Sequence, residues 1–128
     1  MSGYHKLIAF LPYFEELSRD PKRIMEGDQP FVIEATPLYT NYSHEMEEFV
    51  ECMYEVEYID GDYKSTLEEY GVTDVDEMDC KISTANEQLV KAILTKMIRD
   101  ERFTSGAWIT YAKKGLFEKA LRRMGELY

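Results

Sequence analysis

The apolar residues between Leu89 and Ile98 recur at the spacing of an α-helix, and this pattern constrains the fold more than any other feature of the chain. They are Leu89, Val90, Ile93, Leu94, Met97 and Ile98. Separations of three and four residues place them on one helical face. The preceding run Thr84-Ala-Asn-Glu87 has the form of a capping box. We therefore expect a helix that opens at this box, runs to about Glu101 and buries its apolar face.

Two similar stripes predict helices in the first half of the chain. Residues 4–19 carry one, which Pro12 interrupts. Proline inside a helix costs ~3 kcal/mol, so either two short helices meet there or one kinked helix runs through. Ser43 is a good N-cap for a second helix that ends near Tyr58. Its apolar stripe consists of Met46, Phe49, Val50, Met53 and Tyr54.

The segments beside these helices are less regular. Residues 63–70 form a shorter helical pattern, and Gly71 is expected to end it in the left-handed conformation. Residues 72–82 are acidic and are expected to form a loop. The run Phe31-Val32-Ile33 lies between two prolines. Its β-prone residues predict one extended or short-strand segment near residues 30–42.

The C-terminal part carries two more helical patterns. Thr104 or Ser105 is expected to cap the first, which ends at Gly115, and the second covers residues 116–127. A chain of 128 residues fits one domain. We therefore predict a mostly α fold, with a single compact domain of about five or six helices over residues 1–128.

Composition excludes several classes of protein. An aromatic content of 13% argues against intrinsic disorder. Cys52 and Cys80 are the only cysteines, which excludes a disulfide scaffold and predicts two reduced thiols. No apolar stretch approaches the ~18–20 residues of a membrane span, and no signal peptide is visible. We expect a cytoplasmic protein that does not enter membranes.

Charge is distributed unevenly along the chain. Residues 41–80 contain fourteen acidic residues and one basic residue, Lys64. Residues 91–128 contain nine basic residues and four acidic ones. The whole chain has a net charge of −10. Either the two segments neutralise each other in the fold, or one of them forms a surface for a partner.

The acidic segment predicts a surface for a basic protein partner, and such a surface could imitate a nucleic-acid backbone. The candidate residues are Glu47, Glu51, Glu55, Asp60 and Asp62. Ten tyrosines exceed what a small core needs. Because tyrosine is favoured at interfaces, they point to a partner surface or a homo-oligomer.

The basic segment predicts the alternative, a nucleic-acid-binding surface. The candidate cations for this surface are Lys91, Lys96, Arg99, Arg102, Lys113, Lys114, Arg122 and Arg123. Among them Arg99, Arg102, Arg122 and Arg123 are candidates for binding an anion through forked hydrogen bonds. The net charge of −10 opposes approach to phosphates and favours the acidic surface.

Catalysis and metal binding have little support in the sequence. His44, Glu48 and Cys52 share one helical face, but a thiolate and a carboxylate at this spacing match no standard metal site. Phosphate-binding glycine motifs are absent. An enzyme centred on His44 is a third hypothesis. We predict a protein that is not an enzyme and uses no metal or cofactor.

The C-terminal third contains the pattern R-x-x-R-F-x-x-G, then a further glycine, then L-R-R. The residues are Arg99, Arg102, Phe103, Gly106, Gly115, Leu121, Arg122 and Arg123. With Phe10-Leu-Pro-Tyr-Phe14 and Pro37-Leu-Tyr-x-x-Tyr42, the chain resembles a bacterial and phage family of domains of unknown function. The acidic residues 60–82 depart most from that family. The resemblance implies a small helical cytoplasmic protein of bacterial or mobile-element origin, without an assigned activity.

Overall fold

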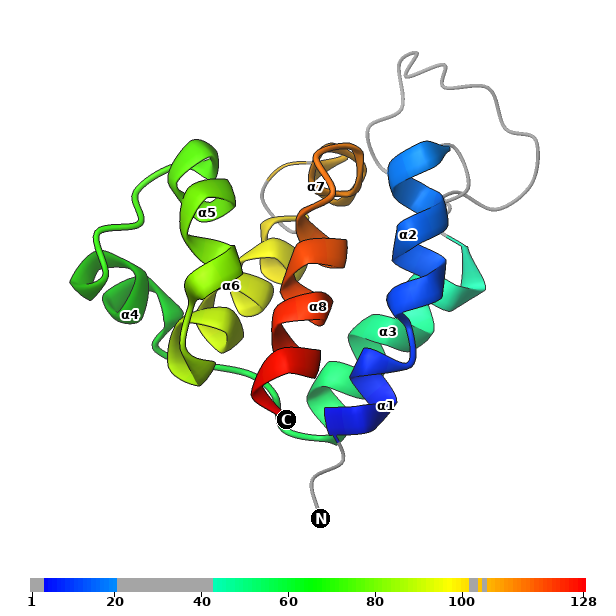
Figure 1. Cartoon of the computed structure of the whole chain (residues 1–128), viewed down its shortest axis with the longest axis horizontal. Helices are drawn as coiled ribbons and strands as arrows, with labels where there is room; N and C mark the ends of the chain where they lie inside the picture. Colours follow the sequence, from blue (N-terminus) through cyan, green and yellow to red (C-terminus); the bar gives the residue numbers. More distant parts are fainter. Residues whose placement is uncertain (1–3, 21–42, 102–103, 105) are drawn as a thin grey trace.

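The computed structural model describes residues 4–20, 43–101, 104 and 106–128, and these residues form helices joined by short turns (Figure 1). The first half contains α1 (Tyr4–Ile8), α2 (Leu11–Arg19), α3 (His44–Glu55) and α4 (Tyr63–Glu69). The second half contains α5 (Val75–Lys81), the 3-10 turn η2 (Ile82–Thr84), α6 (Glu87–Asp100), α7 (Ala107–Lys113) and α8 (Leu116–Leu127). The predicted mostly α fold is confirmed, and the described residues include no strand.

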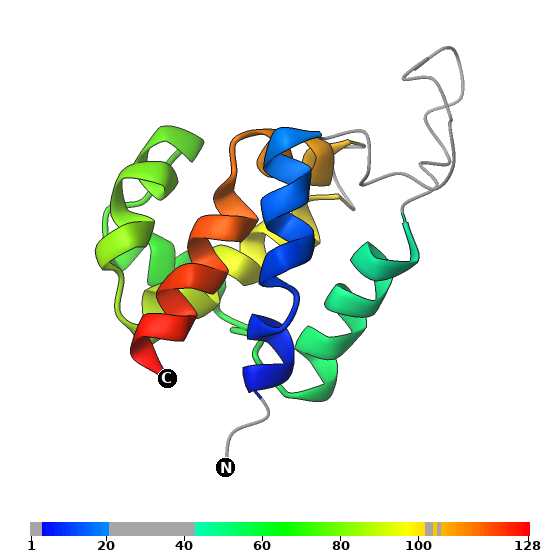
Figure 2. The ribbon, with the colours of Figure 1, turned by 45° about the vertical axis from the view of Figure 1, so that its right-hand side comes forward.

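Helix α6 is the element around which the others pack. Its buried residues are Leu89, Val90, Ala92, Ile93, Leu94, Thr95, Met97 and Ile98. Because they extend beyond a single stripe, several helices are needed to cover them. Helices α4, α7 and α8 all pack against α6, which lies behind α8 in the middle of the molecule (Figures 1 and 2). The predicted apolar stripe is therefore the centre of the core.

A cluster of phenylalanine rings joins α2, α3 and α8. Phe14 stacks on Phe117 with ring centroids 4.9 Å apart. Phe49 meets both rings edge-on, at 4.8 Å and 5.9 Å. None of the three side chains is more than 1% exposed. The rings therefore connect the N-terminal helices to the C-terminal ones through the core.

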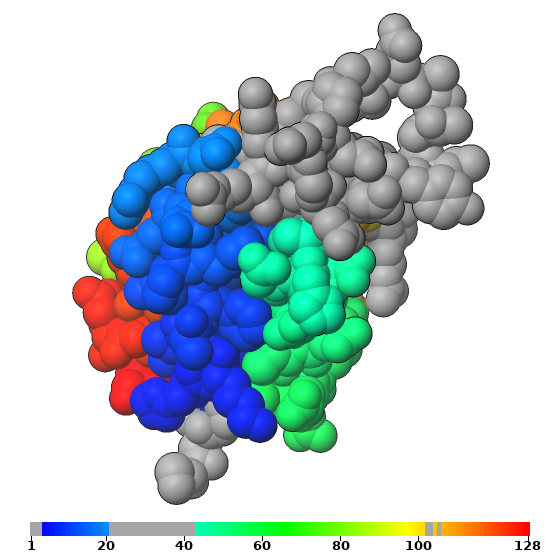
Figure 3. Space-filling model, turned by 90° about the vertical axis from the view of Figure 1, so that its right-hand side faces the viewer, coloured from blue at the N-terminus to red at the C-terminus, as the bar shows by residue number. Residues whose placement is uncertain are grey.

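Helix α3 lies at the surface of the molecule, beside α1 (Figure 3). Ser43 caps it as predicted, because its hydroxyl accepts a hydrogen bond from the Met46 amide at 3.3 Å. The inward side carries Met46, Phe49, Cys52 and Met53. The opposite side carries acidic residues that are exposed.

The N-terminal stripe forms two helices, which is the first of the two predicted arrangements. Helix α1 ends at Ile8, and α2 begins at Leu11. Pro12 therefore lies in the first turn of α2. Proline is tolerated there because an amide in the first turn has no partner within the helix.

The prediction of a loop over residues 72–82 is wrong. Helix α5 occupies most of this segment, followed by η2. Asp74 caps α5 by accepting a hydrogen bond from the Glu77 amide at 2.8 Å. Met78 is fully buried and holds the helix against the core. The extended segment predicted near residues 30–42 lies outside the described residues.

Two predicted helix caps are also corrected. Asn86 is the N-cap of α6, and its side chain accepts a hydrogen bond from the Leu89 amide at 2.9 Å, so Thr84 is not the cap. Gly106 is the N-cap of α7 and has a φ of +88°. The Glu101 carboxylate accepts hydrogen bonds there from the Gly106 and Trp108 amides at 2.9 Å and 3.1 Å. The Glu101 carboxylate thus takes the place of the cap expected from Thr104, and Ser105 lies outside the described residues.

The buried hydroxyl of Thr95 ties the start of α4 to α6. It donates to the Lys91 carbonyl at 2.7 Å and accepts from the Asp60 amide at 3.0 Å. Thr95→Val leaves that amide without its acceptor, so we expect it to lower the free energy of unfolding by about 1–3 kcal/mol, measured by urea denaturation. Thr110→Val is the control, because Thr110 is exposed and makes the same backbone contact to Gly106. Equal losses for the two variants would contradict the role of Thr95.

Candidate functional site

Three of the predicted acidic residues form a continuous strip on α3. Glu47, Glu51 and Glu55 are four residues apart and exposed, so they follow one side of the helix. Glu55 contacts the Lys6 ammonium at 3.5 Å, and both side chains are more than 60% exposed. Such an exposed ion pair contributes ~0–1 kcal/mol. Glu47 and Glu51 have no ion-pair or hydrogen-bond partner among the described residues. We call these three residues the acidic strip.

Tyr54 lies at the edge of the acidic strip, and its exposure differs from the prediction. Helical spacing predicts Tyr54 as part of the apolar stripe of the helix, but its side chain is 42% exposed. It is the only large hydrophobic residue classed as exposed in the part of the chain that the structure describes. At 3.6 residues per turn, Tyr54 projects about 20° from the direction of Glu47, on the side away from Glu51. An aromatic ring is thus exposed beside unpaired carboxylates.

Asp60 and Asp62 belong to a different local structure. The Asp60 carboxylate accepts hydrogen bonds from the Asp62 amide at 2.8 Å and from the Thr66 hydroxyl at 2.7 Å. It therefore stabilises the turn that leads into α4. Asp62 is the exposed residue before that helix. The structure separates these two aspartates from the acidic strip by the turn after α3.

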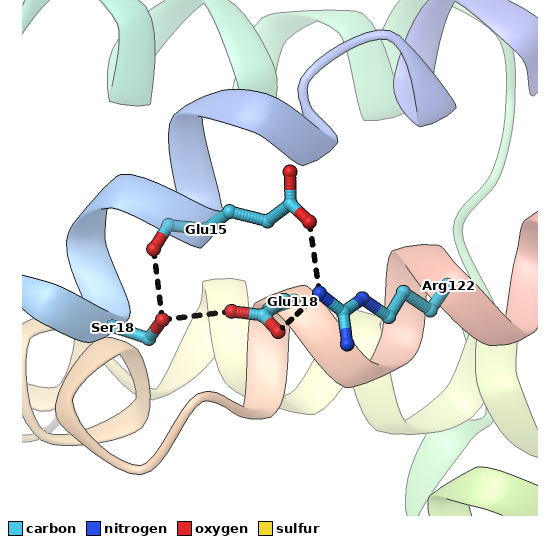
Figure 4. A network of polar contacts seen from close by, with 4 residues as sticks. All are labelled: Glu15, Ser18, Glu118 and Arg122. Carbon is cyan, nitrogen blue, oxygen red and sulfur yellow. Dashed lines mark hydrogen bonds and ion pairs between the residues drawn. The ribbon is translucent and has the colours of Figure 1, made fainter.

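Arg122 is held in a polar network that joins α2 to α8 (Figure 4). Its guanidinium contacts Glu15 at 2.8 Å and Glu118 at 3.0 Å. The Ser18 hydroxyl donates to Glu118 at 2.7 Å. The hydrogen bond to Glu15 and the charge of Glu118 raise the pKa of Arg122. Two carboxylates therefore already occupy the side chain that was predicted to bind an external anion.

The other candidate arginines also have local contacts, and the structure does not gather them into one site. Arg123 donates to the Ala85 carbonyl at 2.7 Å and contacts Glu126 at 3.2 Å. The Arg99 guanidinium lies 5.7 Å from the centre of the Tyr63 ring, while its buried Nε has no hydrogen-bond partner. Arg102 lies outside the described residues.

The lysines of the basic segment also have contacts within this chain. Lys96 contacts Asp100 at 2.8 Å, and Lys119 pairs with Asp79. The Lys91 ammonium lies 5.6 Å from the centre of the Tyr58 ring. Most carboxylates that neutralise the basic segment come from α2, α5, α6 and α8. The acidic strip on α3 is therefore left with little compensation.

The remaining catalytic and metal candidates are dispersed. His44 is exposed and pairs with Glu48. Cys52 is buried on the inward side of α3, and burial raises the pKa of its thiol. The described residues contain no cluster of three side chains of the types that ligate metals. His44 and Glu48 therefore form an exposed contact within α3, with no third ligand beside them among the described residues.

Comparisons with known proteins add one finding. A protein-family model described as "Family of unknown function (DUF6508)" matches residues 2–128. No curated protein matches the chain, and no solved structure matches it. Among the described helices, none has the length and apolar character needed to cross a membrane.

Proposed function

Since the chain belongs to DUF6508, a family of unknown function, no activity comes with the family, and we propose from the surface chemistry that the protein is a non-enzymatic interaction or regulatory module. It binds a basic protein partner through the outward side of α3. The proposal depends on one observation: Tyr54 is exposed beside the acidic strip, in which Glu47 and Glu51 have no partner among the described residues. The resemblance to a family of unknown function is confirmed by the match.

This combination fits the anatomy of protein interfaces. Tyrosine is enriched at interfaces because its ring is apolar while its hydroxyl tolerates water. An arginine of a partner can lie over the Tyr54 ring while its charge meets Glu47 or Glu51. The net charge of −10 also favours encounter with basic molecules.

Nucleic-acid binding by the basic segment has less support. Arg122, Lys96 and Lys119 are paired with carboxylates of this chain. Binding to phosphates would have to break those contacts. It would also have to overcome repulsion from the excess negative charge.

We expect reversal of the acidic strip to abolish partner binding. The variant Glu47→Lys/Glu51→Lys/Glu55→Lys and the variant Tyr54→Ala are immobilised beside the wild-type protein in a cell extract. Retained proteins are quantified by mass spectrometry. Basic proteins should be retained by the wild type and lost from both variants. Tyr54→Ala separates the contribution of the ring from that of charge.

A matched control variant has the same net charge as the variant with the reversed acidic strip. The variant Glu69→Lys/Asp76→Lys/Glu126→Lys also reverses three exposed acidic residues, all outside α3. It should retain the same proteins as the wild type. Equal retention by the strip variant and the wild type would overturn the proposal. Wild-type binding to a labelled DNA duplex that weakens linearly on a log–log plot against salt would instead support the basic segment.

A further inference from the structure

A groove of about 330 Å³ lies between α4 and α6. Its buried lining consists of Tyr63, Leu67 and Val72, each no more than 8% exposed. In Figure 1, α4 and α3 lie towards opposite ends of the long axis. The groove is thus separate from the acidic strip, and its volume suits a small organic molecule.

The α4 side of the groove carries two side chains of opposite charge. Lys64 and Glu68 both line it and are exposed. They are one helical turn apart, but they form no ion pair with each other or with another described residue. Each is therefore available to a bound molecule.

The α6 side of the groove is already neutralised. The Lys96 ammonium contacts Asp100 Oδ2 at 2.8 Å, and the Tyr111 hydroxyl donates to the same oxygen. This carboxylate is only 19% exposed. The pair forms a fixed polar wall without net charge, so the charges that select a ligand are those of Lys64 and Glu68.

We propose that this groove binds a free α-amino acid with an apolar side chain. The side chain lies on Tyr63, Leu67 and Val72, the carboxylate meets the Lys64 ammonium, and the α-ammonium meets the Glu68 carboxylate. A simple anion would be repelled by Glu68, and a simple cation by Lys64. A neutral apolar molecule would leave both charges without a partner. A zwitterion with an apolar group can contact the apolar lining, the Lys64 ammonium and the Glu68 carboxylate at the same time.

An NMR titration of the full chain with L-leucine tests the proposal. Saturable amide shifts are expected at α4, residues 72–73 and the C-terminal half of α6. N-acetyl-L-leucine lacks the ammonium, and L-leucinamide lacks the carboxylate. Each analogue is expected to bind roughly tenfold more weakly, the effect of losing one charge-assisted contact. Equal binding by the analogues would overturn the proposal, as would the absence of saturable shifts with L-leucine.

Single substitutions assign the two contacts. Glu68→Gln and Lys64→Met should each weaken L-leucine binding roughly tenfold. Glu69→Gln and Lys114→Met are the matched controls, because both residues are exposed and neither lines the groove. Unchanged spectra away from the groove verify folding of each variant. Affinity that falls equally in the controls would contradict the assigned contacts.

Discussion

Replacing Phe117 by alanine is expected to lower the free energy of unfolding by about 3–5 kcal/mol. The side chain is fully buried. Its ring lies 4.9 Å from that of Phe14, 5.9 Å from Phe49 and 6.4 Å from Tyr111. Truncation therefore leaves a cavity where α2, α3, α7 and α8 meet. Since domains are stable by only about 5–15 kcal/mol, the loss is a large fraction of the total.

Urea denaturation followed by circular dichroism measures this loss. Tyr54→Ala removes an aromatic ring of similar size from the surface of α3, where it is 42% exposed. We expect this control to change the free energy of unfolding by less than ~1 kcal/mol. A cost below about 1 kcal/mol for Phe117→Ala would mean that the rings do not meet as described.

The helices with long apolar stripes could be predicted from sequence. The end of α6 and both ends of α8 were predicted to within a residue, whereas the N-cap of α6 is Asn86, two residues after the predicted Thr84. Helical spacing determines which side chains share a face, so burial of that face follows directly. Gly71 and Gly115 were also recognised, and both adopt a positive φ.

The short helix α5 could not be predicted in the same way. It has seven residues, of which only Met78 is buried, so it produces no periodic pattern. Its start depends on the Asp74 side chain, and aspartate is as common in loops as in caps. Its position depends on the burial of Met78 in the core and on the pairing of Asp79 with Lys119 of α8, tertiary contacts that local sequence does not encode.

The position of the acidic strip could be predicted from sequence, but its lack of basic partners within the fold could not. Spacing of four residues placed Glu47, Glu51 and Glu55 on one side of a helix. The partners of the basic segment depend on tertiary structure, since Arg122 and Glu15 are 107 residues apart. Likewise, the groove needs α4 beside α6, and sequence alone does not bring Lys64 and Lys96 to the same site.

Stability is expected to fall steeply above pH 10 because buried tyrosines stay protonated in the fold. Burial raises the pKa of Tyr58 and Tyr111 far above the ordinary value of 10.0, and it raises that of Tyr13 to about 12. Below pH 10 these phenols are neutral in both states, so stability is fully present. As the pH rises further, the unfolded chain loses these protons first, and the free energy of unfolding decreases.

The magnitude follows from proton linkage. Each tyrosine that ionises only in the unfolded chain removes about 1.4 kcal/mol per pH unit. Tyr58 and Tyr111 are no more than 6% exposed, so together they are expected to remove about 2–3 kcal/mol per unit above pH 10. Urea denaturation at a series of pH values measures the slope, and tyrosinate absorbance of the folded protein reports the ionisation directly.

Tyr58→Phe isolates the effect, because it keeps the ring beside Tyr4 and Tyr128 but removes the ionising hydroxyl. Its slope above pH 10 should be smaller than that of the wild type by about 1.4 kcal/mol per pH unit. Tyr54→Phe removes an exposed hydroxyl and should leave the slope unchanged. Identical slopes for wild type and Tyr58→Phe would therefore show that the Tyr58 phenol ionises in the fold as readily as in the unfolded chain.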